Sequence, residues 1–384
     1  MAGVITGASM ITSVGQTRAA CFEAFCQGLT GNKPLQSFNQ SRYNLTRAYE
    51  IADRPATRRD IKGRSTNWLC EVVNQAIKEA GLEQCREQRL TALIGTGLRE
   101  LRSLELWWAD GQPLAVNELH FGGALVRSAN ITGPVITLSN ACAASSFALG
   151  LADDLLILGE AEAVIVAGCD SITESMFGSG DRASMLRPER VQPFDRDRRG
   201  ALLGEGAAAV VLESERSASA RGVAPLASLR GVGMSCDAFH ETAPDQAGMA
   251  RAMTDAHLRA SVIPDEIDLL LAHGTGTALN DKVEALAIKE VFGRRAESVP
   301  ITALKSLIGH TSGASGLVGV ATALECLNQG RIPPTAGFNA PMEEAIGLDI
   351  VAGEARAVPV QIVQVNAFGF GGVNAVVILE RISR

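Results

Sequence analysis

The sequence predicts an α/β protein with a layered and duplicated architecture. Short runs of β-branched and aliphatic residues alternate with longer segments of helical periodicity, which is typical of strands buried between layers of helices. One strand leads into Cys142, and another much further along the chain leads into His310. Each is followed by a helix that opens with Gly, Ala and Ser. This repeated order indicates two related halves that face one shared site.

Local patterns place the elements of the first half. Gly81 and Gly159 each follow a helical pattern, where glycine commonly ends a helix. The turn at residues 131–134, Ile-Thr-Gly-Pro, separates a strand from what precedes it. In chain order the expected elements are a strand over 4–6, a helix over 66–80, strands over 91–95 and 135–138, an apolar helix before Gly159, and a strand over 163–167.

The second half repeats this order. Its expected elements are a strand over 268–272, a helix over 281–292, a strand over 299–303 and a small-residue helix that ends near Gly330. No low-complexity linker separates the halves, which we place at residues 1–230 and 231–384. The first half then carries Cys142, and the second carries His273 and His310.

Composition excludes several classes of function. The formal charge is −7, with 35 Lys and Arg against 42 Asp and Glu, which gives no overall attraction for nucleic acid or anionic lipid. No apolar run approaches the length of a membrane-spanning helix, and the N-terminus lacks the pattern of a signal peptide. The eight cysteines form no C-x-x-C pair and lie in core-like segments. We therefore expect a soluble, reduced, cytoplasmic protein without a metal site.

Cys142 is the candidate nucleophile. A single cysteine is usually a small buried hydrophobic residue, but this one follows a strand directly and precedes a helix. Free N–H groups at a helix start favour a thiolate, so the local structure is expected to lower the pKa of this thiol. Its neighbours are alanines and serines, which leave room for a substrate.

Two of the five histidines stand just after predicted strands in glycine-rich surroundings. They are His273, in His-Gly-Thr-Gly-Thr, and His310, in Gly-His-Thr-Ser-Gly. Either alone is most simply a hydrogen-bonded residue at a strand end. Metal binding is disfavoured because no second ligand lies at helical spacing from either histidine. Two such sites together with Cys142 favour catalysis.

The chain resembles the β-ketoacyl-acyl carrier protein synthases, condensing enzymes of the thiolase superfamily, from Val4 to Glu380. The matching segments, in the order of that family, are Asn140-Ala-Cys-Ala-Ala-Ser145, Pro193-Phe-Asp-Arg-Asp-Arg-Arg-Gly200, Asp237-Ala-Phe-His240, His273-Gly-Thr-Gly-Thr277, Lys305-Ser-Leu-Ile-Gly-His310 and Asn366-Ala-Phe-Gly-Phe-Gly-Gly-Val-Asn374. The resemblance implies a thiolase fold with a duplicated, five-layered αβαβα architecture.

The resemblance also implies a reaction. The Cys142 thiolate would take an acyl chain from the 4'-phosphopantetheine of an acyl carrier protein. A malonyl thioester would then lose carbon dioxide, and the resulting enolate, stabilised by N–H groups of His273 and His310, would attack the acyl group. The backbone N–H groups of Cys142 and Phe370 would hold the oxyanion of the transfer step. No bound cofactor is expected.

Supporting roles follow from the same resemblance. Lys305 would lie near the reacting groups in an electrostatic and orienting role, with Glu284 as its acidic partner and Asp281 beside it. Thr275 and Thr277 would hydrogen-bond the pantetheine arm, although they also suit a turn that satisfies its own backbone.

Phe370 would act as a gate over Cys142. It lies between Gly369 and Gly371, and these glycines would permit a backbone swing. Without the resemblance, an aromatic residue in a tight turn is simply part of a core.

A basic cluster in this acidic chain is the expected docking surface for the acyl carrier protein, which is itself acidic. It comprises Arg54, Arg58, Arg59, Lys62 and Arg64. Most such clusters are merely solvated faces. The docking hypothesis rests on Arg58, Arg59, Lys62 and Arg64.

Several departures from the family leave the pathway open. Gly319 and Val373 replace the usual Glu and Thr, and residues 98–128 match poorly. The chain therefore fits polyketide or polyene synthesis as well as fatty-acid elongation. An alternative is a chain-length-factor subunit, which does not condense, but such subunits generally lack the active cysteine. A homodimer and a heterodimer with a ketosynthase-like paralogue both remain open.

Overall fold

The computed structural model describes residues 3–55, 60–83, 90–184 and 186–382. Ten strands form one sheet in the order β10-β9-β13-β14-β8-β1-β7-β6-β4-β5. One end of the sheet is built from β1 (Gly3–Thr12), β7 (Gly206–Ser214), β6 (Ala163–Asp170), β4 (Thr91–Gly95) and β5 (Val135–Leu138). The other end is built from β8 (Ala227–Cys236), β14 (Val373–Glu380), β13 (Ile362–Gly369), β9 (Leu269–Leu271) and β10 (Ile301–Thr302).

The two ends of the sheet have the same topology. From β1 outward, the pairings with β7 and then β6 are antiparallel, and those with β4 and β5 are parallel. From β8 outward, β14 and β13 pair antiparallel, and β9 and β10 pair parallel. The sets meet where β1 and β8 pair antiparallel, from Gly3 opposite Leu229 to Ile5 opposite Ala227. This correspondence supports the duplication expected from the sequence.

The division into halves at residues 1–230 and 231–384 stays a prediction. Its boundary lies inside β8, the strand that begins the second set.

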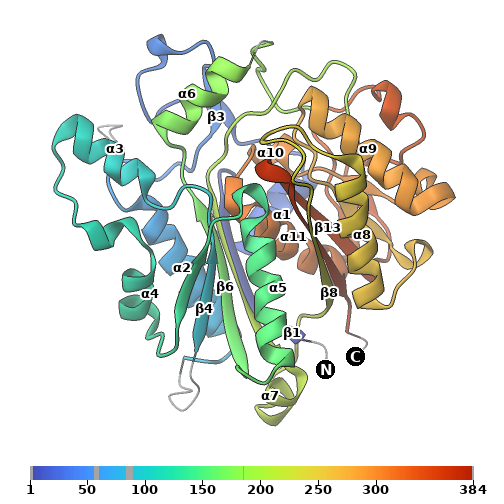
Figure 1. The fold of residues 1–384 in the computed structure, drawn as a ribbon, viewed down its shortest axis with the longest axis horizontal. Coiled ribbons are helices and arrows are strands. Elements are labelled where there is room, and N and C mark those ends of the chain that lie inside the picture. The colour runs from blue at the N-terminus through green and yellow to red at the C-terminus, as the bar shows by residue number, and fades with distance from the viewer. Residues whose placement is uncertain (1–2, 56–59, 84–89, 185, 383–384) are drawn as a thin grey trace.

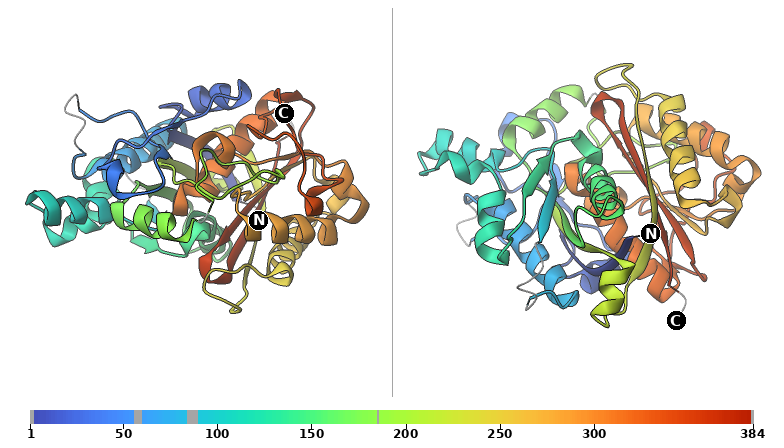
Figure 2. Two further views of the ribbon diagram at one scale, coloured as in Figure 1. Left: turned by 90° about the horizontal axis from the view of Figure 1, so that it is seen from above. Right: turned by 60° about the horizontal axis from the view of Figure 1, so that its bottom comes forward.

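Helices form three layers around the two parts of the sheet (Figures 1 and 2). Two helices, α5 (Ala144–Ile157) and α11 (Ser315–Gln329), pack against each other and lie between the two halves. The outer layers are α2 (Arg64–Glu79) on the N-terminal set and α8 (Gln246–Ala260) with α9 (Ala278–Phe292) on the C-terminal set. The expected five-layered αβαβα thiolase fold is confirmed.

Small residues make the central layer possible. A side chain at Gly316, at the start of α11, would collide with Ser146 of α5. A side chain at Gly95, at the end of β4, would collide with the backbone of Ser145. The high glycine content therefore reflects close approach of buried elements around the start of these two helices.

The remaining elements surround this framework. They are α1 (Arg18–Cys26), α3 (Leu101–Asp110), α4 (Gly122–Ala129), α6 (Glu174–Ala183), α7 (Glu215–Ala220), the single turn α10 (Lys305–Ile308), and the two-stranded sheets β2 (Asn32–Pro34) with β3 (Arg47–Tyr49) and β11 (Arg331–Ile332) with β12 (Arg356–Ala357). Within the described ranges, every helix is too short or too polar to cross a membrane.

The expected elements are found, with some different bounds. The strands predicted at 91–95 and 135–138 match β4 and β5 exactly in extent, whereas β1 is longer than predicted and β9 and β10 are shorter. One composition-based expectation is wrong for two cysteines. Cys236 is exposed and Cys70 is half-buried, so not every cysteine other than Cys142 lies in the core.

Candidate active site

Cys142 lies in a sharp connection between β5 and α5. It is the middle residue of a short 3₁₀ turn (Ala141–Ala143), and Ala141 has a φ of 47°, in the left-handed region that non-glycine residues rarely adopt. The half-buried thiol therefore projects from a constrained turn at the start of the buried helix α5. This is the placement that the sequence predicted.

The pKa of the Cys142 thiol differs from the expectation. Burial raises it above its ordinary value, while the positive charge of Lys305 and backbone hydrogen bonds from Phe370 and Cys142 act in the opposite direction. The sequence suggested a lowered pKa from the helix start alone. In the structure burial has the larger effect, so at neutral pH the resting group is mainly a thiol.

His273 follows β9 and is held by Lys305. The ammonium Nζ of Lys305 lies 3.2 Å from His273 Nδ1 and also donates to the His273 carbonyl oxygen. An ammonium has only donors, so Nδ1 must accept, and the ring proton is on Nε2. Burial and the Lys305 charge lower the pKa of His273 well below its ordinary value, so the ring is neutral.

His310 is held in the same tautomer by a different donor. The backbone N–H of Ser312 donates to His310 Nδ1 over 3.1 Å, which leaves the proton on Nε2. The two imidazole rings lie edge to face, with centroids 5.4 Å apart. Burial, and then the charge of Lys305, lower the pKa of His310 well below its ordinary value. Two neutral rings thus each present an Nε2–H group.

Glu284 does not form the expected salt bridge with Lys305. Its carboxylate accepts the backbone N–H groups of His273, over 2.7 Å, and Gly274, over 2.8 Å, and also bonds the Asn366 amide. Its charge acts on Lys305 only through space, while burial lowers the pKa of Lys305 to about 8. Glu284 therefore orients the turn that carries His273.

Asp281 supports the next residues of the same turn. It accepts the backbone N–H groups of Thr275 and Gly276 and, on its other side, that of Phe194. The hydroxyls of Thr275 and Thr277 lie 2.8 Å apart. Thr277 also caps α9 by accepting the backbone N–H of Asn280. This is the alternative role that the sequence left open, in which a threonine satisfies the backbone of its own turn. The pantetheine contact stays a prediction.

The predicted gate lies directly against Cys142. A side chain at Gly369 would come within 3.2 Å of the Cys142 backbone nitrogen. Phe370 is 56% exposed, and Gly371 has a φ of 80° and donates its N–H to the carbonyl of Glu241. A ring this exposed is not part of the core. Its movement as a gate stays a prediction.

Within the described part of the chain, no three His, Cys, Asp or Glu side chains are grouped closely enough to hold a metal ion.

Comparison with known proteins assigns the family. Residues 4–218 match the model of the β-ketoacyl synthase N-terminal domain, and residues 226–339 match that of the C-terminal domain. The chain belongs to the β-ketoacyl synthase family. The family confirms the resemblance read from the motifs and the expected acyltransferase class.

Individual relatives span nearly the whole chain of this ketosynthase. It is 31% identical to the 3-oxoacyl-[acyl-carrier-protein] synthase 2 of Coxiella burnetii, over 99% of this chain and 98% of that protein. It is 31% identical to the tetracenomycin polyketide synthase ketoacyl synthase alpha subunit of Streptomyces glaucescens, over 98% and 96%. Among solved structures, the ishigamide ketosynthase/chain length factor has a TM-score of 0.90 and 32% identity, over 100% and 99% of the two chains.

The docking hypothesis for this ketosynthase needs one correction. Arg64 is 4% exposed, and its guanidinium bonds three carboxylates, those of Asp53, Asp60 and Glu205. A buried, fully paired arginine is not available to a partner. Lys62 is exposed and bonds Glu118 and the Pro113 carbonyl. Arg58 and Arg59 lie outside the described residues.

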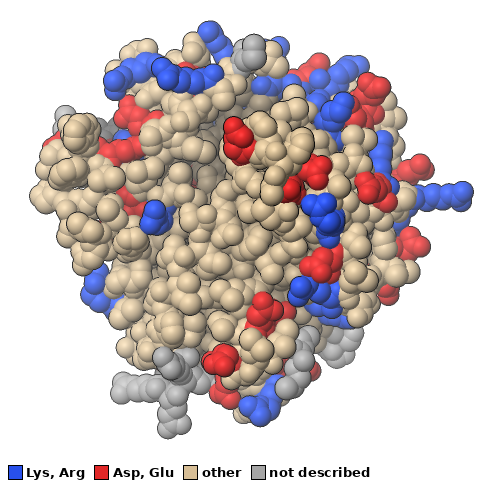
Figure 3. Space-filling model, viewed as in Figure 1, with Lys and Arg blue, Asp and Glu red and all other residues tan. Residues whose placement is uncertain are grey.

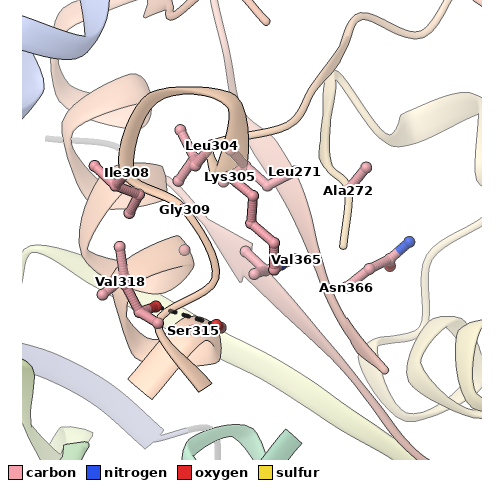
Figure 4. Close-up of a pocket in the computed structure, with 12 residues that line it drawn as sticks. Leu271, Ala272, Leu304, Lys305, Ile308, Gly309, Ser315, Val318, Val365 and Asn366 are labelled. Atoms are coloured by element: carbon pink, nitrogen blue, oxygen red, sulfur yellow. Dashed lines mark hydrogen bonds between the residues drawn. The ribbon is translucent and has the colours of Figure 1, made fainter. Parts of the chain in front are cut away.

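The structure gives a physical reason for Gly319. A small cavity of about 20 Å³ lies beside Lys305, between α10, α11, β9 and β13 (Figure 4). Gly319 lines it, and a side chain there would meet Val365 at 2.6 Å. The glutamate usual in the family would have to displace this valine. Within the described residues, the side-chain amine of Lys305 bonds His273 and forms no ion pair with an acidic side chain.

Asp170 is the residue that the sequence analysis missed. It ends β6 and is 1% exposed, with its carboxylate bonded to segments from both halves. An acidic residue that directly ends a fully apolar strand is the signal that could have found it.

Replacing Lys305 with Met should slow alkylation of Cys142. The Lys305 charge opposes the effect of burial on the thiol pKa, so its loss should raise that pKa further. A higher pKa means less thiolate, so the rate of reaction with iodoacetamide at pH 8 should fall several-fold. The measurement is a pH series of labelling, read on the Cys142 peptide by mass spectrometry.

Lys282 provides the control, because it is an exposed lysine on the outer helix α9 that forms an ion pair with Glu344. Lys282→Met should leave the labelling profile unchanged. Identical profiles for wild type and Lys305→Met would show that the Lys305 charge has no influence on the thiol.

Proposed function

We propose that this chain condenses an acyl group held on Cys142 with a malonyl group carried by an acyl carrier protein, in fatty-acid or type II polyketide or polyene biosynthesis. The observation that carries the proposal is the pair of neutral imidazoles, each with its proton fixed on Nε2. Fixed N–H donors in a buried site are what an enolate oxygen requires.

The reaction has three steps. The Cys142 sulfur attacks the acyl thioester, and the pantetheine thiol leaves with a proton. The malonyl thioester then breaks its bond to the carboxylate, which departs as carbon dioxide, and the electron pair is held as an enolate whose oxygen accepts from His273 and His310. The enolate carbon attacks the acyl carbon, and the Cys142 thiolate leaves.

The neutral state of both histidines suits the middle step. The departing carboxylate must give up its bonding electrons to the thioester. A charged donor would pair with that carboxylate, so the site needs neutral hydrogen-bond donors. With pKa values well below the ordinary range, both rings remain neutral donors across the physiological pH range.

The test is an ordered assay with the intact chain. Incubation with an acyl-loaded carrier protein should add one acyl mass to the protein, and subsequent malonyl carrier should release carbon dioxide and form a β-ketoacyl carrier. Absence of acylation, or acylation at a residue other than Cys142, would contradict the proposal. A panel of chain lengths in the same assay defines the acyl specificity.

We propose a dimer, with a second copy or a ketosynthase-like paralogue, at the edge strand β5. This strand ends the sheet, and its Ile136 is 43% exposed. Few charged side chains cover the neighbouring face over β4, β6 and α5 (Figure 3). Light scattering of the chain, alone and mixed with candidate paralogues, distinguishes the homodimer from the heterodimer. A stable, fully active monomer would contradict both.

We further propose that the carrier protein docks on exposed arginines beside the turn that carries Thr275 and Thr277. Arg198 donates to the carbonyls of Thr277 and Ala278, which places its segment at this turn, and the flanking Arg196 and Arg199 are exposed. Basic side chains gather along the upper edge of the face in Figure 3, over α6 and the loop that follows it. An acidic carrier fits such a surface.

Reversing both charges, Arg196→Glu with Arg199→Glu, should reduce turnover of carrier-bound substrate about tenfold or more and leave turnover of a small pantetheine thioester unchanged. The control is Arg216→Glu, an exposed arginine on α7 at the opposite end of the molecule. Equal losses for both substrates would contradict docking at this surface.

A further inference from the structure

Asp170 joins the two halves of the molecule through one buried carboxylate. Its Oδ1 accepts the hydroxyl of Thr96 and the backbone N–H of Leu98, each over 2.7 Å. Its Oδ2 accepts the backbone N–H of Gly97 over 2.9 Å and that of Gly313 over 2.7 Å. The first three donors follow β4 in one half, while Gly313 belongs to the other half.

Gly313 is part of the turn that orients His310. This turn (Ser312–Ala314) begins with the residue whose backbone N–H donates to His310 Nδ1. Ser312 has a φ of 49°, a left-handed conformation that needs support from its surroundings. The bond from the adjacent Gly313 to Asp170 supplies that support, and a side chain at Gly313 would come within 2.6 Å of the Gly97 nitrogen.

We propose that Asp170 is a positioning residue for His310. By holding Gly313 it fixes Ser312, and Ser312 in turn fixes the ring and keeps its proton on Nε2, where the enolate oxygen forms. The inference rests on the proposed function, because it assigns Asp170 to the decarboxylation step in which His310 donates.

Stability alone does not account for this carboxylate. Among the described residues, the groups that act most strongly on this carboxyl are hydrogen-bond donors and not cations, and burial raises the pKa of Asp170 to about 6. A carboxyl whose pKa is higher in the folded than in the unfolded state favours folding below that pKa. The contribution is lost as pH rises through about 6. At neutral pH the ionised group therefore adds less to stability than the protonated group does at low pH.

The charge of Asp170 also acts on Cys142, and this effect distinguishes the acylation step from the decarboxylation step. Among the described groups, it raises the pKa of the thiols of Cys142 and Cys169. Removing the charge should make Cys142 no less reactive. A role confined to His310 therefore predicts that acylation is kept while decarboxylation is lost.

The decisive variant is Asp170→Asn. Its amide oxygen keeps the donors at Oδ1, and its NH₂ group then faces the N–H groups of Gly97 and Gly313. The Gly97 N–H also lies 3.2 Å from Oδ1, so the contact to the His310 turn is the one that is lost. We expect Cys142 to acylate at the wild-type rate or faster, and carbon dioxide release from malonyl carrier to fall about ten- to a hundredfold. The variant should still unfold cooperatively on heating at pH 7, which shows that it folds.

The matched control is Asp153→Asn, because Asp153 on α5 is also a largely buried acid with a pKa raised to about 6. It should leave both steps unchanged. Wild-type decarboxylation by Asp170→Asn would overturn the inference, as would a proportional fall in both steps or failure of this variant alone to fold. A wild-type chain that is never acylated would instead overturn the proposed function.

Discussion

Replacing Cys142 with Ala should abolish the gain of acyl mass and reduce condensation at least about a thousandfold. No other group in the constrained turn after β5 can form the thioester, because the residues next to Cys142 are alanines. Intact-protein mass spectrometry after incubation with acyl carrier protein measures the first effect. Product formation from malonyl carrier measures the second.

Two observations make this result specific. The exposed Cys236, whose Sγ lies 3.8 Å from the Gly371 carbonyl, provides a matched control, and Cys236→Ala should acylate normally. The Cys142→Ala variant should still release carbon dioxide from malonyl carrier, because both histidines are intact. Acyl mass remaining on Cys142→Ala would show that another residue is the nucleophile.

Replacing His310 with Ala should leave the acyl-enzyme intact and reduce decarboxylation by about two to three orders of magnitude. This is the usual loss when one preorganised donor to a developing oxyanion is removed. His273→Ala should reduce decarboxylation to a similar extent. It should also leave the position of the Lys305 side chain less well defined, because Lys305 loses its partner at Nδ1. Single-turnover acylation and carbon dioxide release, measured separately, distinguish the two steps.

A conservative variant sharpens the assignment. His310→Asn keeps an N–H donor of similar reach and should recover part of the rate lost in His310→Ala, which a purely steric role would not allow. The exposed His120 offers a neutral control in His120→Ala. Equal loss of acylation and decarboxylation in His310→Ala would contradict the assigned role.

Local patterns were sufficient to predict most of the sheet's parallel strands and to single out the three candidate catalytic residues. Cys142 and His273 lie shortly after β5 and β9, where the apolar pattern ends, whereas the helical turn α10 separates His310 from β10. The antiparallel strands β7, β8, β13 and β14 were not predicted as elements. β7, for example, is the run Gly-Ala-Ala-Ala-Val-Val-Leu-Glu-Ser, whose alanines are as typical of a helix.

Long-range pairing explains what the sequence could not show. The charge run that includes Arg64 looks exposed because its partner Glu205 lies 141 residues further along the chain. Likewise, the bond between Asp170 and Gly313 spans 143 residues. Whether a charged residue is a surface contact or an internal connection depends on the tertiary fold, and local periodicity carries no information about it.

The glycine at the start of α11 has a consequence for catalytic geometry. Cys142 precedes α5, His310 precedes α11, and these helices approach closely where Gly316 faces Ser146. A single methyl group at this contact would collide with the hydroxyl of Ser146, between the starts of the two helices. The absence of a side chain at Gly316 thus lets the segments that carry Cys142 and His310 start two closely packed helices.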